Sequence, residues 1–151
     1  MKWNPKDIEM YLSAKEYVDT VVLPLLPVSF GEDMKQAVSM TEFVNLLGVQ
    51  LERQLKGRLF MLQGFSYLRN SSEERRLKDL MYWEEKLFKE GFKHVVYITC
   101  DSDWKKTEGE MAGTLIWMPS LPLESMDENY KTSIIEDQVK QLLTILTQEW
   151  Q

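Results

Sequence analysis

The stretch from His94 to Trp104, HVVYITCDSDW, constrains the fold more than any other part of this chain. Its first half favours a β-strand, because residues 95–99 are mostly β-branched or aromatic. The strand stops at a short acidic cluster that contains Asp101 and Asp103. Helical patterns and strand-like runs alternate before this stretch, and such alternation is typical of α/β proteins with a parallel sheet.

Four helices are predicted from their start signals and from apolar residues at spacings of three and four. The first is short, and the second lies within residues 33–56 with its main part beginning near Ser39. The third ends at Gly91, and the last runs to the C-terminus. The start signals of the four helices are Asn4-Pro5, Ser39–Glu42, Ser71–Glu74 and Ser125–Glu128.

Four strands are predicted between and after these helices. The first covers Thr20 to Leu23 and could continue to Val28 across Pro24 and Pro27, which have no N–H for a sheet ladder. The second covers residues 58–62, the third is the stretch described above, and the fourth covers residues 111–118. The loop DSDWKKTEGE between the last two strands leaves no room for a helix, so these strands are expected to form an antiparallel pair.

The predicted element order is therefore α-β-α-β-α-β-β-α, in a single domain that covers residues 1–151. Strand–helix–strand units give parallel pairs with right-handed crossovers. We predict an α/β three-layer sandwich with a mostly parallel four-stranded sheet in the order 2-1-3-4, in which strand 4 is antiparallel. Without the first helix the same order also matches the thioredoxin topology, but no Cys-x-x-Cys precedes its first helix, so redox chemistry does not follow.

Composition and charge exclude several classes of function. The formal net charge of −6 argues against a general nucleic-acid binder, since affinity for phosphate comes mostly from clustered Lys and Arg. The longest apolar run, VVLPLLPV, is too short to span a membrane. The N-terminal segment has no apolar core typical of a secretion signal, and a single cysteine suits a reducing compartment. We therefore expect a cytoplasmic protein without a transmembrane segment.

The segment KEYVDTVVLPLLPVSFG, residues 15–31, resembles the YpiF-like proteins, a family of small uncharacterised proteins from spore-forming Gram-positive bacteria. Chain length, Trp3 near the start and the order of elements agree with this resemblance over essentially the whole chain. The resemblance implies a cytoplasmic bacterial protein. It supplies no activity, cofactor or catalytic residue.

A ligand site in an open α/β sheet is expected beyond the carboxyl ends of the parallel strands. Here those ends supply polar residues whose candidate members are Ser29, Ser66, Tyr67, Asp101 and Asp103. The two aspartates could hold Mg²⁺ through carboxylate oxygens or act as acid and base. The alternative, which we favour, is that Asp101 only starts a turn by bonding its own backbone.

Other catalytic arrangements have less support. Neither G-x-G-x-x-G nor G-x-x-x-x-G-K-[ST] occurs, so there is no sequence signal for a phosphate loop. His94 is the single histidine and starts the strand that Cys100 follows, so roughly 20 Å of extended chain separates them. A Cys–His or Ser–His mechanism and a zinc site are therefore disfavoured, and no residue near Cys100 lowers the pKa of its thiol. No cofactor or metal is expected.

These observations favour a non-catalytic protein-interaction or regulatory module over an enzyme. It could be a homodimer, formed through an apolar helix face or through an edge strand, or it could bind another protein. The competing hypothesis is a small α/β enzyme or ligand-binding domain that uses the strand-end crevice with Asp101 and Asp103.

Overall fold

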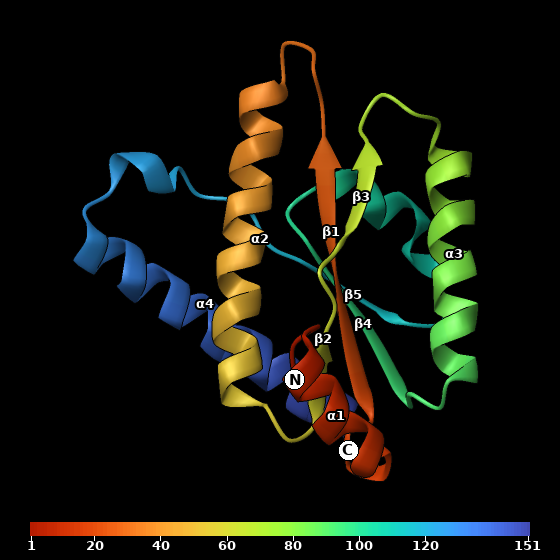
Figure 1. Ribbon diagram of the computed structural model, residues 1–151. Coiled ribbons are helices and arrows are strands. Elements are labelled where there is room, and N and C mark those ends of the chain that lie inside the picture. The colour runs from red at the N-terminus through yellow and green to blue at the C-terminus, as the bar shows by residue number, and fades with distance from the viewer.

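The computed structural model describes all residues from 1 to 151 and shows a mixed α/β protein built on one mostly parallel sheet (Figure 1). The coarse prediction of an α/β fold is confirmed. Three 3₁₀ segments, Lys15–Tyr17, Ser102–Glu110 and Leu123–Ser125, lie between the main elements. The helices and strands are α1 (Pro5–Ser13), β1 (Thr20–Val28), α2 (Met34–Gln54), β2 (Leu59–Met61), β3 (Phe65–Leu68), α3 (Glu73–Lys89), β4 (His94–Thr99), β5 (Thr114–Trp117) and α4 (Glu128–Glu149).

The sheet has five strands and not the predicted four. Its order is β2-β1-β4-β5, and β3 pairs with the second half of β1 on the same side as β2. The predicted order 2-1-3-4 therefore differs in detail, because the predicted second strand, residues 58–62, corresponds to β2 alone and β3 is an additional strand. Every pair in the sheet is parallel.

The break between β2 and β3 lies opposite Pro24 of β1. The carbonyls of Val22 and Val28 accept hydrogen bonds from the N–H groups of Leu62 and Arg69, on the side of β1 where β2 and β3 lie. Backbone groups of alternate residues in a strand point to the same side, so those of Pro24 face β2 and β3 as well. Proline has no N–H to donate there, and the pairing shifts by one residue, from Val22↔Met61 to Leu25↔Phe65. Gly64 fills the break with φ of 134°, a conformation that favours glycine.

The prediction of an antiparallel strand 4 is wrong, because β5 runs parallel to β4 with Val96 opposite Thr114. The connection is a compact 3₁₀ segment, Ser102–Glu110, in place of the predicted loop. A 3₁₀ helix rises about 2 Å per residue, so nine residues return the chain about 18 Å along the sheet. That length is enough for a parallel crossover without an α-helix.

Helices pack on both faces of the sheet, and each face has its own hydrophobic core (Figure 1). On one face, α2 and α4 cover strand residues such as Val22, Val96 and Ile116. On the other face, α3, α1 and the 3₁₀ segment Ser102–Glu110 cover Val21, Tyr97 and their neighbours. The apolar stripe of α4 is therefore part of the internal core and not a free surface.

Helix α2 begins at Met34, earlier than the start near Ser39 predicted from the capping box. Its apolar stripe already includes the buried Ala37, one turn before Met40, so packing extends the helix towards its N-terminus. None of the helices combines the length and the hydropathy that crossing a bilayer requires.

Candidate functional site

The carboxyl ends of β3 and β4 bring Tyr67 and Asp101 into contact. The Tyr67 hydroxyl donates a 2.7 Å hydrogen bond to Asp101 Oδ2, and both residues are buried. Asp101 Oδ1 accepts the backbone N–H of Asp103 at 3.0 Å and so caps the 3₁₀ segment. Asp101 thus has the turn-forming role that its sequence context predicts, together with a partner from another strand.

A chain of polar contacts continues from Asp101 to the end of β1. Arg69 Nε lies 3.4 Å from Asp101 Oδ2, and Arg69 Nη1 lies 3.0 Å from Asp33 Oδ2. The Ser29 hydroxyl donates to the other oxygen of Asp33. This hydrogen bond and the Arg69 guanidinium hold the pKa of Asp33 below its usual value. The network joins the ends of β1, β3 and β4, and both of its carboxylates, those of Asp33 and Asp101, have hydrogen-bond or ion-pair partners.

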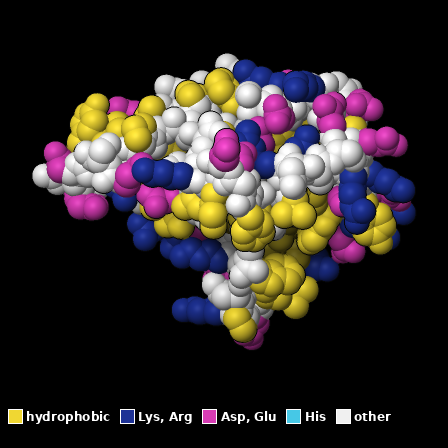
Figure 2. Space-filling model, turned by 90° about the horizontal axis from the view of Figure 1, so that it is seen from above, with side chains coloured by type: hydrophobic (Ala, Val, Ile, Leu, Met, Phe, Trp, Pro, Cys, Tyr) yellow, Lys and Arg dark blue, Asp and Glu magenta, His cyan; other side chains and the backbone are white.

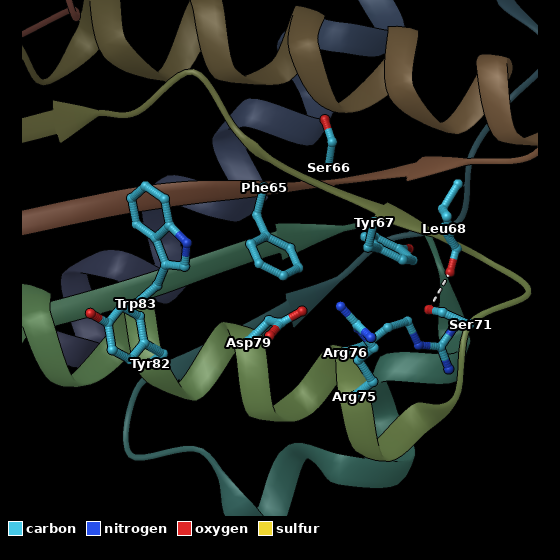
Figure 3. Close-up of a pocket in the computed structure, with 10 residues that line it drawn as sticks. All are labelled: Phe65, Ser66, Tyr67, Leu68, Ser71, Arg75, Arg76, Asp79, Tyr82 and Trp83. Carbon is cyan, nitrogen blue, oxygen red and sulfur yellow. Dashed lines mark hydrogen bonds between the residues drawn. The ribbon is translucent and has the colours of Figure 1, made fainter.

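Ser66 and Asp103 do not join this network. Ser66 follows Phe65 on β3, and its side chain points to the opposite side of the strand from Tyr67 (Figure 3). Asp103 is 42% exposed and lies 3.6 Å from Lys106 Nζ. The five predicted candidates are thus near one end of the sheet, but their side chains do not converge on one point.

Burial favours the neutral forms of Tyr67 and Cys100 near this end of the sheet. Burial and the Asp101 carboxylate raise the pKa of the Tyr67 hydroxyl far above its usual value, so Tyr67 remains a hydrogen-bond donor. Burial and the same carboxylate raise the pKa of Cys100 to about 12. His94 starts β4 and Cys100 follows its end, as predicted. No three His, Cys, Asp or Glu side chains are grouped as metal ligands.

A more open feature lies beside this network, between β3 and α3. It is a groove with a cavity of about 370 Å³ (Figure 3). We call it the β3–α3 groove. From β3, Phe65 and Tyr67 point into it towards α3. The residues that line the groove are Phe65, Ser66, Tyr67, Leu68, Ser71, Arg75, Arg76, Asp79, Tyr82 and Trp83.

One wall of the groove is an unpaired strand edge. The N–H of Arg69 donates to Val28 in β1, so by alternation the backbone groups of Ser66 and Leu68 point away from β1. The carbonyl of Leu68 accepts from the backbone and the hydroxyl of Ser71. The outward N–H and C=O of Ser66 and the N–H of Leu68 have no strand beside them, because β2 and β3 form this edge of the sheet.

Large side chains remain exposed at this groove. Tyr82 is 63% exposed and Trp83 is 46% exposed, both on α3. Trp83 also lines an adjoining cavity of about 210 Å³ with Trp3, which is 58% exposed. The exposed aromatic surface therefore extends from α3 towards the N-terminal segment.

Charge is mixed on the end of the molecule where the parallel strands finish. Figure 2 looks onto this end and shows Lys and Arg side chains beside Asp and Glu side chains, with hydrophobic patches between them. Neither sign of charge forms one large patch in this view.

The β3–α3 groove was not predicted from the sequence. The sequence predicted Ser66 and Tyr67 as members of the strand-end site and predicted no site on the third helix. A signal was present, because Tyr82 and Trp83 stand among charged residues of that helix and lie off its apolar stripe. Aromatic residues on the polar face of a helix indicate a surface that a partner could cover.

The fold and these features define a small α/β protein whose parallel sheet has an open edge beside an aromatic groove. The chain belongs to the family described as "Protein of unknown function (DUF2487)", whose model matches residues 9–150. It is similar to "Uncharacterized protein YpiF" of Bacillus subtilis (strain 168), with 38% identity over 99% of this chain and 98% of the relative. This confirms the resemblance stated from the sequence. No solved structure matches the chain.

Proposed function

We propose that this protein is a non-catalytic protein-interaction module, located in the bacterial cytoplasm, that holds an extended segment of a partner in the β3–α3 groove. The observation that carries the proposal is the unpaired edge of β3 beside a groove with exposed aromatic side chains. An extended segment can add to such an edge as a further strand. Main-chain hydrogen bonds then supply affinity, and the groove supplies specificity.

The dimensions and composition of the edge support this function. β3 has four residues and β2 has three, so the edge can pair with a short segment but not with a long flat strand. Leu68, Tyr82 and Trp83 are 50%, 63% and 46% exposed, and aromatic residues are the commonest anchors of protein interfaces. A partner segment would cover these side chains and satisfy the outward backbone groups together.

The competing enzyme hypothesis has weaker support from the geometry. The oxygens of Asp101 already accept from Tyr67 and from the Asp103 backbone, and Arg69 lies close by. Such contacts stabilise the loop after β4 and leave Asp101 buried beneath it. Asp103 faces solvent beside Lys106. A homodimer through α4 is also less favoured than one through β3, because the apolar stripe of α4 is buried within the chain.

The proposal can be tested with a phage-displayed library of random linear peptides selected against the full-length chain. Enriched peptides are expected to lose binding to Ser66→Pro. This substitution removes an outward N–H and places a ring where the added strand would lie, yet it spares the ladder with β1. The matched control Ser66→Ala keeps the N–H and should keep binding, measured by fluorescence anisotropy.

Two outcomes would count against the interaction module. The first is that no selected peptide distinguishes Ser66→Pro from wild type, while circular dichroism and thermal melts show that the variant is folded. The second is that the selected peptides shift the amide resonances at the ends of β1 and β4 but not those of β3. That result would move the binding site to the strand-end crevice.

A further inference from the structure

We propose that the segment bound in the β3–α3 groove carries one acidic side chain, held by Arg75, and a bulky apolar side chain four positions away. This inference rests on the proposed interaction function and specifies the chemistry of the partner.

Two arginines line one end of the groove, and neither forms an ion pair within the protein. Arg76 has internal contacts, since its Nη1 donates to the carbonyl of Arg69 at 3.1 Å. Its guanidinium also lies 5.8 Å from the Tyr67 ring and 5.9 Å from the Trp104 ring. Arg75 is exposed and its side chain has no such contact, so it is free to meet a ligand.

A carboxylate is the complement of this end of the groove. The protein as a whole carries a net charge of −6 and therefore repels anions in general. Arg75, which has no ion-pair partner and lines the groove, makes this place locally attractive to an anion. A guanidinium can bind a carboxylate with two parallel hydrogen bonds. Arg76 adds a second positive charge next to Arg75 on α3.

The opposite charge of Asp79 limits how acidic the partner can be. Asp79 lines the groove one turn further along α3, between the arginines and the aromatic residues (Figure 3). A run of acidic residues would place a second carboxylate beside it and be repelled. The groove therefore favours a single acid at the arginine end and an uncharged continuation.

The aromatic end sets the spacing of the second side chain. Arg75 and Trp83 are eight residues apart on α3, which corresponds to about 12 Å along a helix. An extended chain advances about 3.3 Å per residue, so this length spans about four residues. Side chains at positions i and i+4 of a strand also point to the same face. An acidic and an apolar side chain at this spacing can both face α3.

The inference is tested with fluorescein-labelled, threonine-rich peptides, acetylated and amidated at their ends, that carry Glu and Leu four positions apart. Both orders of the pair are made, since the bound segment could run either way along β3. In the better order, the Glu peptide is expected to bind about three- to tenfold more tightly than its Gln counterpart at low salt. Anisotropy titrations of the full-length chain give the affinities.

Three variants assign the effect to the groove. Arg75→Gln should remove the advantage of Glu over Gln, whereas Lys78→Gln should retain it. Lys78 is exposed on the same helix and does not line the groove, so it controls for the loss of one positive charge. Asp79→Asn should strengthen binding of the Glu peptides, because it removes the repulsive carboxylate.

The failure of this inference and that of the interaction module give different results. Equal affinities for Glu and Gln peptides, with binding still lost in Ser66→Pro, would overturn the acidic preference and leave strand addition intact. A preference for Glu that Arg75→Gln and Lys78→Gln reduce equally would overturn the role of Arg75 and indicate a general charge effect. If no peptide shows binding that depends on Ser66, both proposals are refuted.

Discussion

Replacement of Glu84 tests how the parallel edge strand β5 is held in place. Glu84 on α3 is buried and accepts three hydrogen bonds. Its Oε2 accepts the Tyr97 hydroxyl at 2.6 Å and the Gly113 N–H at 2.9 Å, and its Oε1 accepts the Ala112 N–H at 3.0 Å. One helix carboxylate therefore links β4 to the chain just before β5.

The expected cost follows from counting the donors that lose an acceptor. In Glu84→Gln the amide nitrogen replaces one oxygen, so at least one partly buried N–H, that of Ala112 or Gly113, loses its acceptor, at a cost of about 1–3 kcal/mol. The remaining bonds also lose their charge assistance, which brings the expected loss of unfolding free energy to about 2–4 kcal/mol. Tyr97→Phe removes one donor and leaves no other polar group without a partner, so the free energy of unfolding should fall by about 1–2 kcal/mol.

Urea unfolding followed by tryptophan fluorescence measures these losses, and hydrogen exchange at the amides of β5 localises them. Both variants are expected to unfold at lower urea, with faster exchange in β5 in Glu84→Gln. Glu85→Gln is the matched control, because Glu85 is exposed beside Glu84 and should leave stability nearly unchanged. A Glu84→Gln protein within about 0.5 kcal/mol of wild type, with β5 still protected, would refute the reasoning.

Three further predictions concern single sites. The thiol of Cys100, whose pKa burial raises to about 12, should resist alkylation by iodoacetamide at pH 8 in the folded protein and react on unfolding; rapid native labelling would contradict its burial. Burial alone would raise the pKa of Asp19, but the bidentate hydrogen bonds from Arg58 outweigh it and lower that pKa, so Asp19→Asn should cost about 0.5–1 kcal/mol at pH 7. Urea unfolding should show this difference shrinking as the pH falls below about 4 and vanishing below the folded-state pKa, and a difference that persists there would exclude the ion pair as its source. Gly113→Ala would place a Cβ 2.7 Å from a β4 carbonyl and should lower the melting temperature by several degrees, whereas Gly109→Ala, with open space around it, should change it little.

Local patterns predicted most of the elements, because capping residues and apolar periodicity act within one segment. The apolar stripes and the β-rich run at residues 94–99 predict helices and a strand that the structure contains. The exact starts differ, because Ser72 and Asp127 cap α3 and α4 where the sequence pattern indicated Ser71 and Ser125. The direction of β5 depends instead on contacts distant in sequence, such as Glu84 meeting Gly113. The sequence shows that residues 102–110 are mostly polar. It does not show that they form a 3₁₀ crossover, which Trp104 anchors in the hydrophobic core beneath α3.

The candidate site could likewise be predicted only in part. Parallel strands with polar ends predict that Tyr67 and Asp101 lie near each other, and the structure places them in contact. The groove could not be predicted, because it depends on how far α3 stands from the edge of β3. Contacts between residues distant in sequence form this region, such as that of Phe65 with Trp104, whose ring centroids are 6.3 Å apart.

The prolines of β1 have a consequence for the unfolded and partly folded chain. The segment TVVLPLLPV combines β-propensity, hydrophobicity and absence of charge, which are the properties of sequences that form cross-β fibrils. In a fibril every backbone N–H must bond to the chain above or below, and Pro24 and Pro27 each lack one. In the native sheet these two positions face the β2–β3 break and the region beyond the end of β4. Pro24, which interrupts the sheet edge, and Pro27 thus both protect this stretch from aggregation while the chain folds.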